Sequence, residues 1–182
     1  MTKLKFRSTP HLWFALAVFL PIRLWAQFAA SGTTTVSVTV GPEAAIQINT
    51  TTTTLTAASV FSNYTGTTNF SYKVRTSQTS GAAHIQLEVT TDFSPTGGPS
   101  VGTPPTAGDA LSYTCSVSSP ATSCSGSQTS STASTTSVAT FGAGASSAVA
   151  GNSGSVGWTL TNDPTYQTGA YSATVTFTIS AT

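Results

Sequence analysis

Apolar and polar side chains alternate along most of this chain. The pattern first becomes regular in residues 33–40 (TTTVSVTV), where Val36, Val38 and Val40 are spaced by two. Side chains two apart project from the same face of an extended chain. This stretch is therefore predicted to be a half-buried strand. A Gly-Pro pair at 41–42 ends it, so the strand lies either against its own domain or against another molecule.

The same spacing of two returns in further stretches that are bounded by turn residues. Residues 70–75 and 85–89 are the clearest, and the short Gly-containing connection 77–82 between them predicts an antiparallel hairpin. In that hairpin, Lys73 or Arg75 would lie near Glu88 across the strands. The other predicted strands are residues 44–48, 111–117, 137–141, 156–160 and 171–179.

These patterns predict an all-β fold. Outside the N-terminal leader, no window has the three-four spacing of an amphipathic helix. About seven to nine short strands separated by turn signals are typical of an antiparallel β-sandwich. Residues 62–66 are predicted to form a turn, and the Pro- and Gly-rich residues 93–108 a surface loop. The Ser, Thr, Ala and Gly tract 125–154 is predicted to be a low-complexity loop, mobile except for the strand at 137–141.

Residues 1–26 have the features of a secretory signal peptide. A basic start is followed by a nine-residue apolar run at 12–20 (LWFALAVFL) and by a small residue, Ala26, at the predicted cleavage point. The run is shorter than the roughly 20 residues that a membrane-spanning helix needs; an uncleaved anchor is the alternative. We therefore expect a secreted or cell-surface protein that passes through a periplasm and keeps no integral membrane segment. The mature chain would consist of an N-terminal extension at 27–42 and a sandwich domain at 43–182.

Charge and cysteine content narrow the function classes. Four of the six basic residues lie in or just after the leader, so two basic and five acidic side chains remain, a formal net charge of −3. This balance argues against a nucleic-acid partner. Cys115 and Cys124 are the only cysteines, and in an exported protein such a pair predicts one disulfide. A metal-binding pair is the alternative, but no further Cys or His lies nearby. We expect no metal and no cofactor.

Candidate catalytic and binding residues are few. His84 is the one histidine after the leader, and it shares the parity of Gln86 and Glu88 on the outer face of its strand. It is therefore predicted to be a solvated surface residue. Trp158 has the parity of its apolar neighbours, which predicts core packing. Tyr64 and Tyr166 lie in predicted turns, where exposed aromatic rings are candidates for sugar binding.

Three segments of the chain together resemble the spore coat protein U and chaperone-usher pilin group of secreted bacterial subunits. Residues 33–48 are similar to that group's N-terminal extension and first strand, residues 61–64 (FSNY) to its aromatic turn, and residues 169–179 (GAYSATVTFTI) to its closing strand. The resemblance implies an incomplete immunoglobulin-like sandwich whose missing strand comes from a neighbouring subunit. It also implies a periplasmic chaperone and an outer-membrane usher as assembly partners.

Three hypotheses follow for the function. The first is a non-catalytic structural or adhesive surface subunit, fimbria-like or part of a coat, which forms a homo-oligomer or polymer by strand addition. The donor strand would be residues 33–40, from Thr33 to Val40, with Val36, Val38 and Val40 as subunit contacts. The second is a monomeric secreted β-sandwich that binds a glycan or protein ligand through its loops, with Tyr64 or Tyr166. The third is a secreted hydrolase that uses His84.

Overall fold

The computed structural model describes residues 31–101 and 111–182, so the predicted signal peptide at 1–26 lies outside the described residues. The chain divides into two units, Met1–Val38 and Thr39–Thr182. In the first unit, residues 31–38 belong to no strand, and Val36 and Val38 are 90% and 84% exposed. The strand predicted at 33–40 is therefore not formed in this structure. A strand exists only where its N–H and C=O groups pair with a partner, and alternation alone does not supply one.

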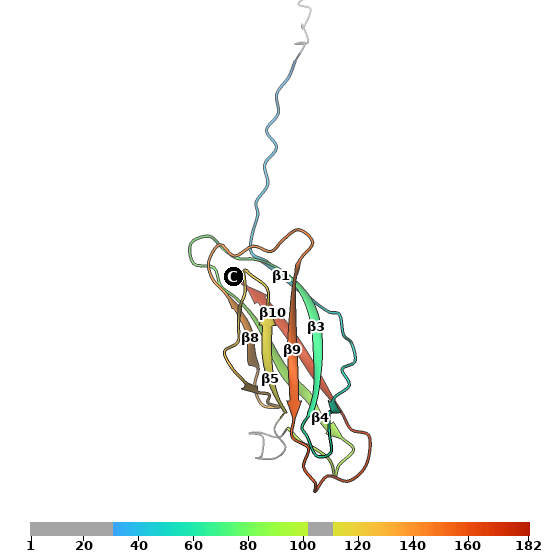
Figure 1. The fold of residues 1–182 in the computed structure, drawn as a ribbon. Helices are drawn as coiled ribbons and strands as arrows, with labels where there is room; N and C mark the ends of the chain where they lie inside the picture. Colours follow the sequence, from blue (N-terminus) through green and yellow to red (C-terminus); the bar gives the residue numbers. More distant parts are fainter. Residues whose placement is uncertain (1–30, 102–110) are drawn as a thin grey trace, which may run out of the picture. The chain divides into compact units, whose positions relative to one another are not determined.

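The second unit is a sandwich of two antiparallel sheets (Figure 1), and its described part contains ten strands and no helix. The prediction of an all-β antiparallel sandwich is confirmed. In the first sheet the order is β1 (Glu43–Ile48), β3 (Tyr64–Arg75), β9 (Asn152–Leu160), β5 (Leu111–Val117) and β7 (Gln128–Thr129), with β2 (Thr56–Ala57) also paired to β3. In the second sheet the order is β10 (Ser172–Ala181), β4 (Ala83–Ser94), β8 (Thr136–Phe141) and β6 (Thr122–Ser123).

The core lies between the two sheets and is built from the alternating side chains that the pattern identifies. On β3, β4 and β9 every second residue is buried over much of the strand. Aromatic rings connect the strands: Tyr72 lies edge-on to Phe141, and Tyr113 packs against Trp158, with ring centroids 5.3 and 5.5 Å apart. The largest fully buried side chains are Phe70, Tyr72, Ile85, Leu87, Val89, Val101, Tyr113, Val138 and Val156.

The predicted hairpin between residues 70–75 and 85–89 is wrong. β3 pairs with β1, β2 and β9, whereas β4 pairs with β10 and β8, so the connection at 76–82 crosses from one sheet to the other. Alternation shows which face of a strand is buried, but it does not distinguish a strand beside it from one facing it across the core. The predicted pairing with Glu88 is absent as well: Arg75 binds Glu43 on β1, with 2.6 Å between Nη2 and Oε2.

Two loop predictions also change. The strand predicted at 137–141 is confirmed as β8, but the tract 125–154 is not simply a loop, because it also holds β7, and Ser130 is fully buried within it. The turn predicted at 62–66 lies earlier, at 59–62, and β3 already begins at Tyr64. Of the predicted loop 93–108, residues 102–108 lie outside the described residues, and Val101 is buried.

Within residues 31–101 and 111–182, no helix has the length and apolar character that crossing a membrane requires.

Candidate functional site

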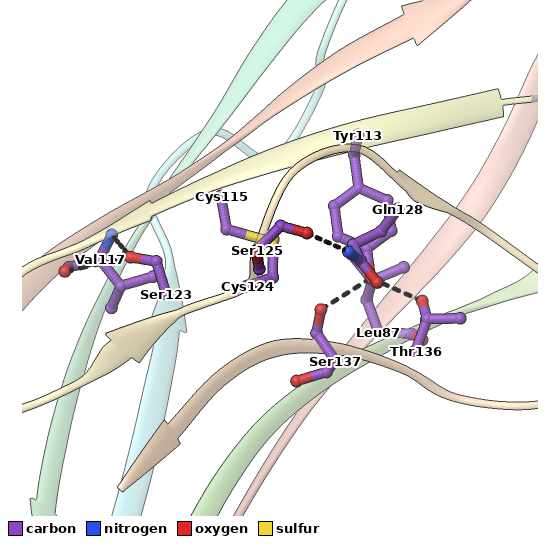
Figure 2. The surroundings of a disulfide bond; sticks show 10 residues. All are labelled: Leu87, Tyr113, Cys115, Val117, Ser123, Cys124, Ser125, Gln128, Thr136 and Ser137. Carbon is purple, nitrogen blue, oxygen red and sulfur yellow. Dashed lines mark hydrogen bonds between the residues drawn. A yellow bond between two sulfur atoms is a disulfide. The ribbon is translucent and has the colours of Figure 1, made fainter.

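The two long edges of the sandwich are built differently, and we name them by that difference. The closed edge consists of β5 and β7 from the first sheet and β6 and β8 from the second. The disulfide between Cys115 on β5 and Cys124, which follows β6, joins the two sheets there, with 5.5 Å between the Cα atoms (Figure 2). The disulfide prediction is thus confirmed. The bond covalently ties one edge of the sandwich.

Hydrogen bonds reinforce the closed edge around the disulfide (Figure 2). The Tyr113 hydroxyl on β5 donates across to the second sheet, to Thr136 Oγ1 at 2.7 Å and to the Ser137 carbonyl at 3.0 Å. Burial raises the pKa of Tyr113, so this hydroxyl stays protonated at neutral pH and remains a donor. The Val117 amide donates to Ser123 Oγ at 2.8 Å. Side chains and chain segments therefore fill the space between the sheets on this side.

The open edge consists of β1 and β10, which are the outermost strands of their sheets on the opposite side. Each pairs with one neighbour, β1 with β3 and β10 with β4, so one side of each strand offers unpaired backbone groups. The inward-facing side chains of both strands pack against the core yet stay partly exposed, and none is buried. These side chains are Ala44, Ile46, Ile48, Ala173, Val175, Phe177, Ile179 and Ala181.

A hollow of about 1010 Å³ lies at the end of the sandwich where β1 finishes and β10 begins, and we call it the open-edge groove. Residues 50–55, which follow β1 and lie beside β3, form one wall of it. Its apolar lining comes from both sheets: Ile48, Leu55, Tyr64, Phe93, Leu111, Trp158, Leu160, Ala173, Val175 and Phe177. The lining includes inward-facing side chains of the sandwich, and those of β10 stay half-buried. Chemically it suits an extended apolar segment.

Polar groups also line the groove, and they carry little charge. In its buried part, the Thr53 and Thr68 hydroxyls lie 2.6 Å apart, and Trp158 Nε1 donates to Thr68 Oγ1 at 2.8 Å. At the far end of the groove, Asp163 accepts hydrogen bonds from the Thr165 amide and hydroxyl at 2.8 and 2.7 Å. Both hydrogen bonds lower the pKa of Asp163, and the one from the amide has the larger effect. The carboxylate therefore fixes its own loop.

The loops at this end support one another. The Gln167 amide donates to the Gly97 carbonyl at 2.8 Å, and the Tyr171 hydroxyl donates to the Gln167 carbonyl at 2.9 Å. The Tyr171 ring lies so close to Gly98 that a Cβ there would come within 2.4 Å of it. Glycine is thus required for this contact. The wall at the end of the groove is consequently well defined.

The structure places the predicted site residues as follows. Trp158 is 5% exposed, which confirms its prediction as a core residue, although it also lines the open-edge groove. Tyr64 and Tyr166 both line this groove, so two tyrosines that are distant in sequence come together. His84 is exposed on β4, as predicted. Val36, Val38 and Val40 are exposed, and their predicted subunit contacts stay a prediction.

Residues 98–102 match a sequence motif of hydrolases, but their surroundings differ from those that the motif requires. Residues 98–102 read G-P-S-V-G, which fits the G-x-S-x-G pattern, but a nucleophile elbow joins a strand to a helix, and no described residue is helical. Ser100 donates to Asp92 at 2.5 Å. His84 lies eight positions from Asp92 on the same strand, about 26 Å away at 3.3 Å per residue. These three side chains do not form a catalytic triad.

Some features of the site were missed by sequence reasoning. Residues 44–48 and 171–179 predict strands. Nothing in their sequences indicates that both strands lack a second hydrogen-bonded neighbour on the same side of the sandwich. Phe61 was assigned only to an aromatic turn, yet it lines the end of the open-edge groove and is 63% exposed. Among the described residues, no group of three or more His, Cys, Asp or Glu side chains is placed to hold a metal ion.

Comparison of the chain with protein-family models, with curated proteins and with solved structures found no match.

Proposed function

We propose that this protein is an exported structural or adhesive surface subunit that polymerises by strand addition, as a fimbria-like or coat component. One observation carries the proposal: the two outermost strands on one side, β1 and β10, have inward-facing apolar side chains that are only half-buried, beside a hollow of about 1010 Å³. Such an edge is completed by an extended segment that supplies backbone pairing and alternate apolar side chains. The sandwich is then an incomplete immunoglobulin-like one.

The dimensions of the N-terminal segment support its role as the donor. Val36, Val38 and Val40 span four residue steps, about 13 Å in an extended chain. The inward-facing side chains of β10 that line the hollow, from Ala173 to Phe177, also span four steps. Burial of three exposed valines stabilises a joint by about 1.5 kcal/mol or more each. Backbone hydrogen bonds along β10 add to this.

The polarity of the strands favours a segment from a second copy. Glu43 pairs with Arg75, and Ala181 pairs with Ala83; because the connection 76–82 joins β3 to β4, β1 begins at the end of the sandwich where β10 finishes. A segment tethered to its own β1 through residues 41–42 would fold back antiparallel to β1 but parallel to β10, which lines more of the groove. A segment from a neighbour can run antiparallel to it. Antiparallel pairing is the more stable per residue.

The test compares two exposed valines in the full exported chain. Val38→Asp places a charge in the proposed joint, and we expect it to convert detergent-resistant oligomers, seen without heating, into monomer. Val149→Asp is the matched control, because Val149 is 96% exposed in a connection away from the groove, and it should leave the oligomers unchanged. A Val38→Asp protein that is folded and as polymeric as the native chain would overturn the proposal. Deleting residues 33–40 should have the same effect as Val38→Asp.

Assembly in this proposal involves a periplasmic chaperone and an outer-membrane usher, and it places the finished protein at the cell surface. The support is the predicted signal peptide and the exposed apolar edge, since an unfilled edge needs protection from random pairing before assembly. Co-purification of the Val38→Asp chain with a periplasmic partner that covers β10 tests this part.

A second candidate function is a monomeric module that binds a glycan or protein ligand. The observation that favours it is the position of Tyr64 and Tyr166, which line the same hollow together with polar threonines. Stacking of a sugar on tyrosine would then dominate binding. Loss of glycan binding in Tyr166→Ala, by a chain that stays monomeric at all concentrations, would favour this function over polymerisation.

A further inference from the structure

The turn at residues 59–62 exposes two apolar side chains in a rigid setting. Val60 is 88% exposed and Phe61 63% exposed. Phe61 has φ 53°, in the left-handed region, which is sterically unfavourable for a residue with a Cβ and is kept only where the surroundings impose it. The turn therefore presents an aromatic ring to solvent against both the hydrophobic effect and the backbone preference.

Hydrogen bonds hold this turn in place. Ser62 Oγ accepts from the Ser59 amide and donates to the Ser59 carbonyl, each at 2.9 Å. The Ser62 carbonyl accepts from Asn162 Nδ2 at 3.1 Å, which attaches the turn to the loop after β9. A strained, exposed and well-supported aromatic residue is typical of a contact surface.

Phe61 stands at the end of the open-edge groove where a donated strand would leave. It lines the same hollow as Tyr171 and Ala173, next to the beginning of β10. A second copy's segment that runs antiparallel to β10 has Val40 at this end. From Val40 to Glu43 there are three Cα steps, at most about 11 Å. The neighbour's β1 must therefore begin close to Phe61.

The end of the sandwich where β1 begins carries a small hollow of about 230 Å³, lined by residues 40–42 and 75–78. We call it the collar hollow. Arg75 fixes its wall: Nε donates to the Gly41 carbonyl at 2.8 Å, and Nη2 binds Glu43 at 2.6 Å. A cavity of about 150 Å³ accommodates benzene, so this one has room for a phenyl ring. The held guanidinium can lie against the face of that ring.

We propose that Phe61 of the acceptor copy packs into the collar hollow of the donor copy, against Pro42 and Arg75, and so locks successive subunits end to end. This inference rests on the proposed strand addition. It assigns the partner of the exposed turn as a second copy of this chain, because the two-residue linker at 41–42 brings these two end surfaces together. The strain at Phe61 is then offset in the assembled state.

The test measures how fast labelled copies exchange between assembled chains of the full-length protein. Phe61→Ala should still assemble but exchange about tenfold faster than the native chain, and Arg75→Ala should do the same. The double variant should also be about tenfold faster, because both changes remove one shared contact. Two results would contradict the proposed contact. One is an exchange rate that Phe61→Ala leaves unchanged, and the other is an exchange rate about a hundredfold faster in the double variant.

Two further variants separate this contact from a folding effect. Phe61→Gly relieves the left-handed strain, so it should fold at an equal or higher melting temperature and yet exchange faster; a native exchange rate would count against the proposal. Val149→Ala is the control and should exchange at the native rate.

If Val38→Asp abolishes assembly while Phe61→Ala has no effect, strand addition stands and only the end-to-end lock fails. If Val38→Asp leaves assembly intact, the proposed function itself fails.

Discussion

The closed and open edges of this sandwich consist of similar strands but differ in what lies between the sheets. At the closed edge, a disulfide and the Tyr113 hydroxyl join β5 to the second sheet, and Ser130 is fully buried beside Leu111. At the open edge, β1 and β10 keep their inward-facing side chains half-buried. The contrast shows that a strand's own pattern does not decide whether its edge is complete. What decides it is which segment comes to lie beside the strand.

Removing the disulfide should have the largest effect on the isolated fold. We expect Cys115→Ser with Cys124→Ser to lower the free energy of unfolding by about 2–4 kcal/mol, mainly because the unfolded chain gains freedom. Urea titration in the Val38→Asp background, where assembly does not contribute, measures this. The double serine variant with native Val38 should still form oligomers, because the open edge is untouched. Loss of oligomers from a folded protein would show that the two edges are coupled.

Removing one tyrosine hydroxyl at each edge compares a buried hydrogen bond with an exposed one. Tyr113→Phe removes the hydrogen bonds to Thr136 and Ser137 and should cost about 1–2 kcal/mol of unfolding free energy, since buried acceptors lose a partner. Tyr171→Phe removes a hydrogen bond to the exposed Gln167 carbonyl, and we expect less than about 0.5 kcal/mol. Equal losses in the two variants would contradict the description of the edges. Denaturation of both proteins under the same conditions measures the difference.

The smallest effect concerns pH at the end of the groove. Hydrogen bonds to Thr165 lower the pKa of Asp163 in the folded protein, so its contribution to stability is present above the unfolded pKa and is lost as pH falls through the folded value. Asp163 is only partly buried, and the change in stability is therefore small. Carboxyl titration followed by NMR should give a midpoint below that of an unstructured aspartate. Thr165→Ala should move the midpoint upward, and an unchanged midpoint would contradict this assignment.

Alternation predicted the strands well, and the exceptions are instructive. The second halves of β3 and β9 and the first half of β4 bury every other side chain, and their parity correctly placed Trp158 in the core and His84 on the surface. The hairpin prediction failed because a seven-residue connection can either turn within a sheet or cross to the other one. Which of these occurs depends on contacts with β9 and β10, about 80 to 100 residues away.

The groove itself was not predictable for a similar reason. Val175 and Phe177 have the same alternation as the fully buried Val89 and Leu87 opposite them on β4. Their half-exposure arises because β10 has no second neighbour in its sheet and both side chains line the open-edge groove. The donor strand was predicted from Val36, Val38 and Val40, and its partner stays a prediction. Only the Gly-Pro break at 41–42 marks it as separate from the sandwich.

Hydrogen exchange at β10 tests the central claim most directly, namely that another copy's segment completes the open edge. Amides of β10 that do not bond to β4 should exchange rapidly in the monomeric Val38→Asp protein and slowly, by about a hundredfold or more, in the assembled native chain. Amides of β8, in the closed half of the same sheet, should be protected alike in both. Unprotected β10 amides in assembled protein would contradict strand addition at the open edge.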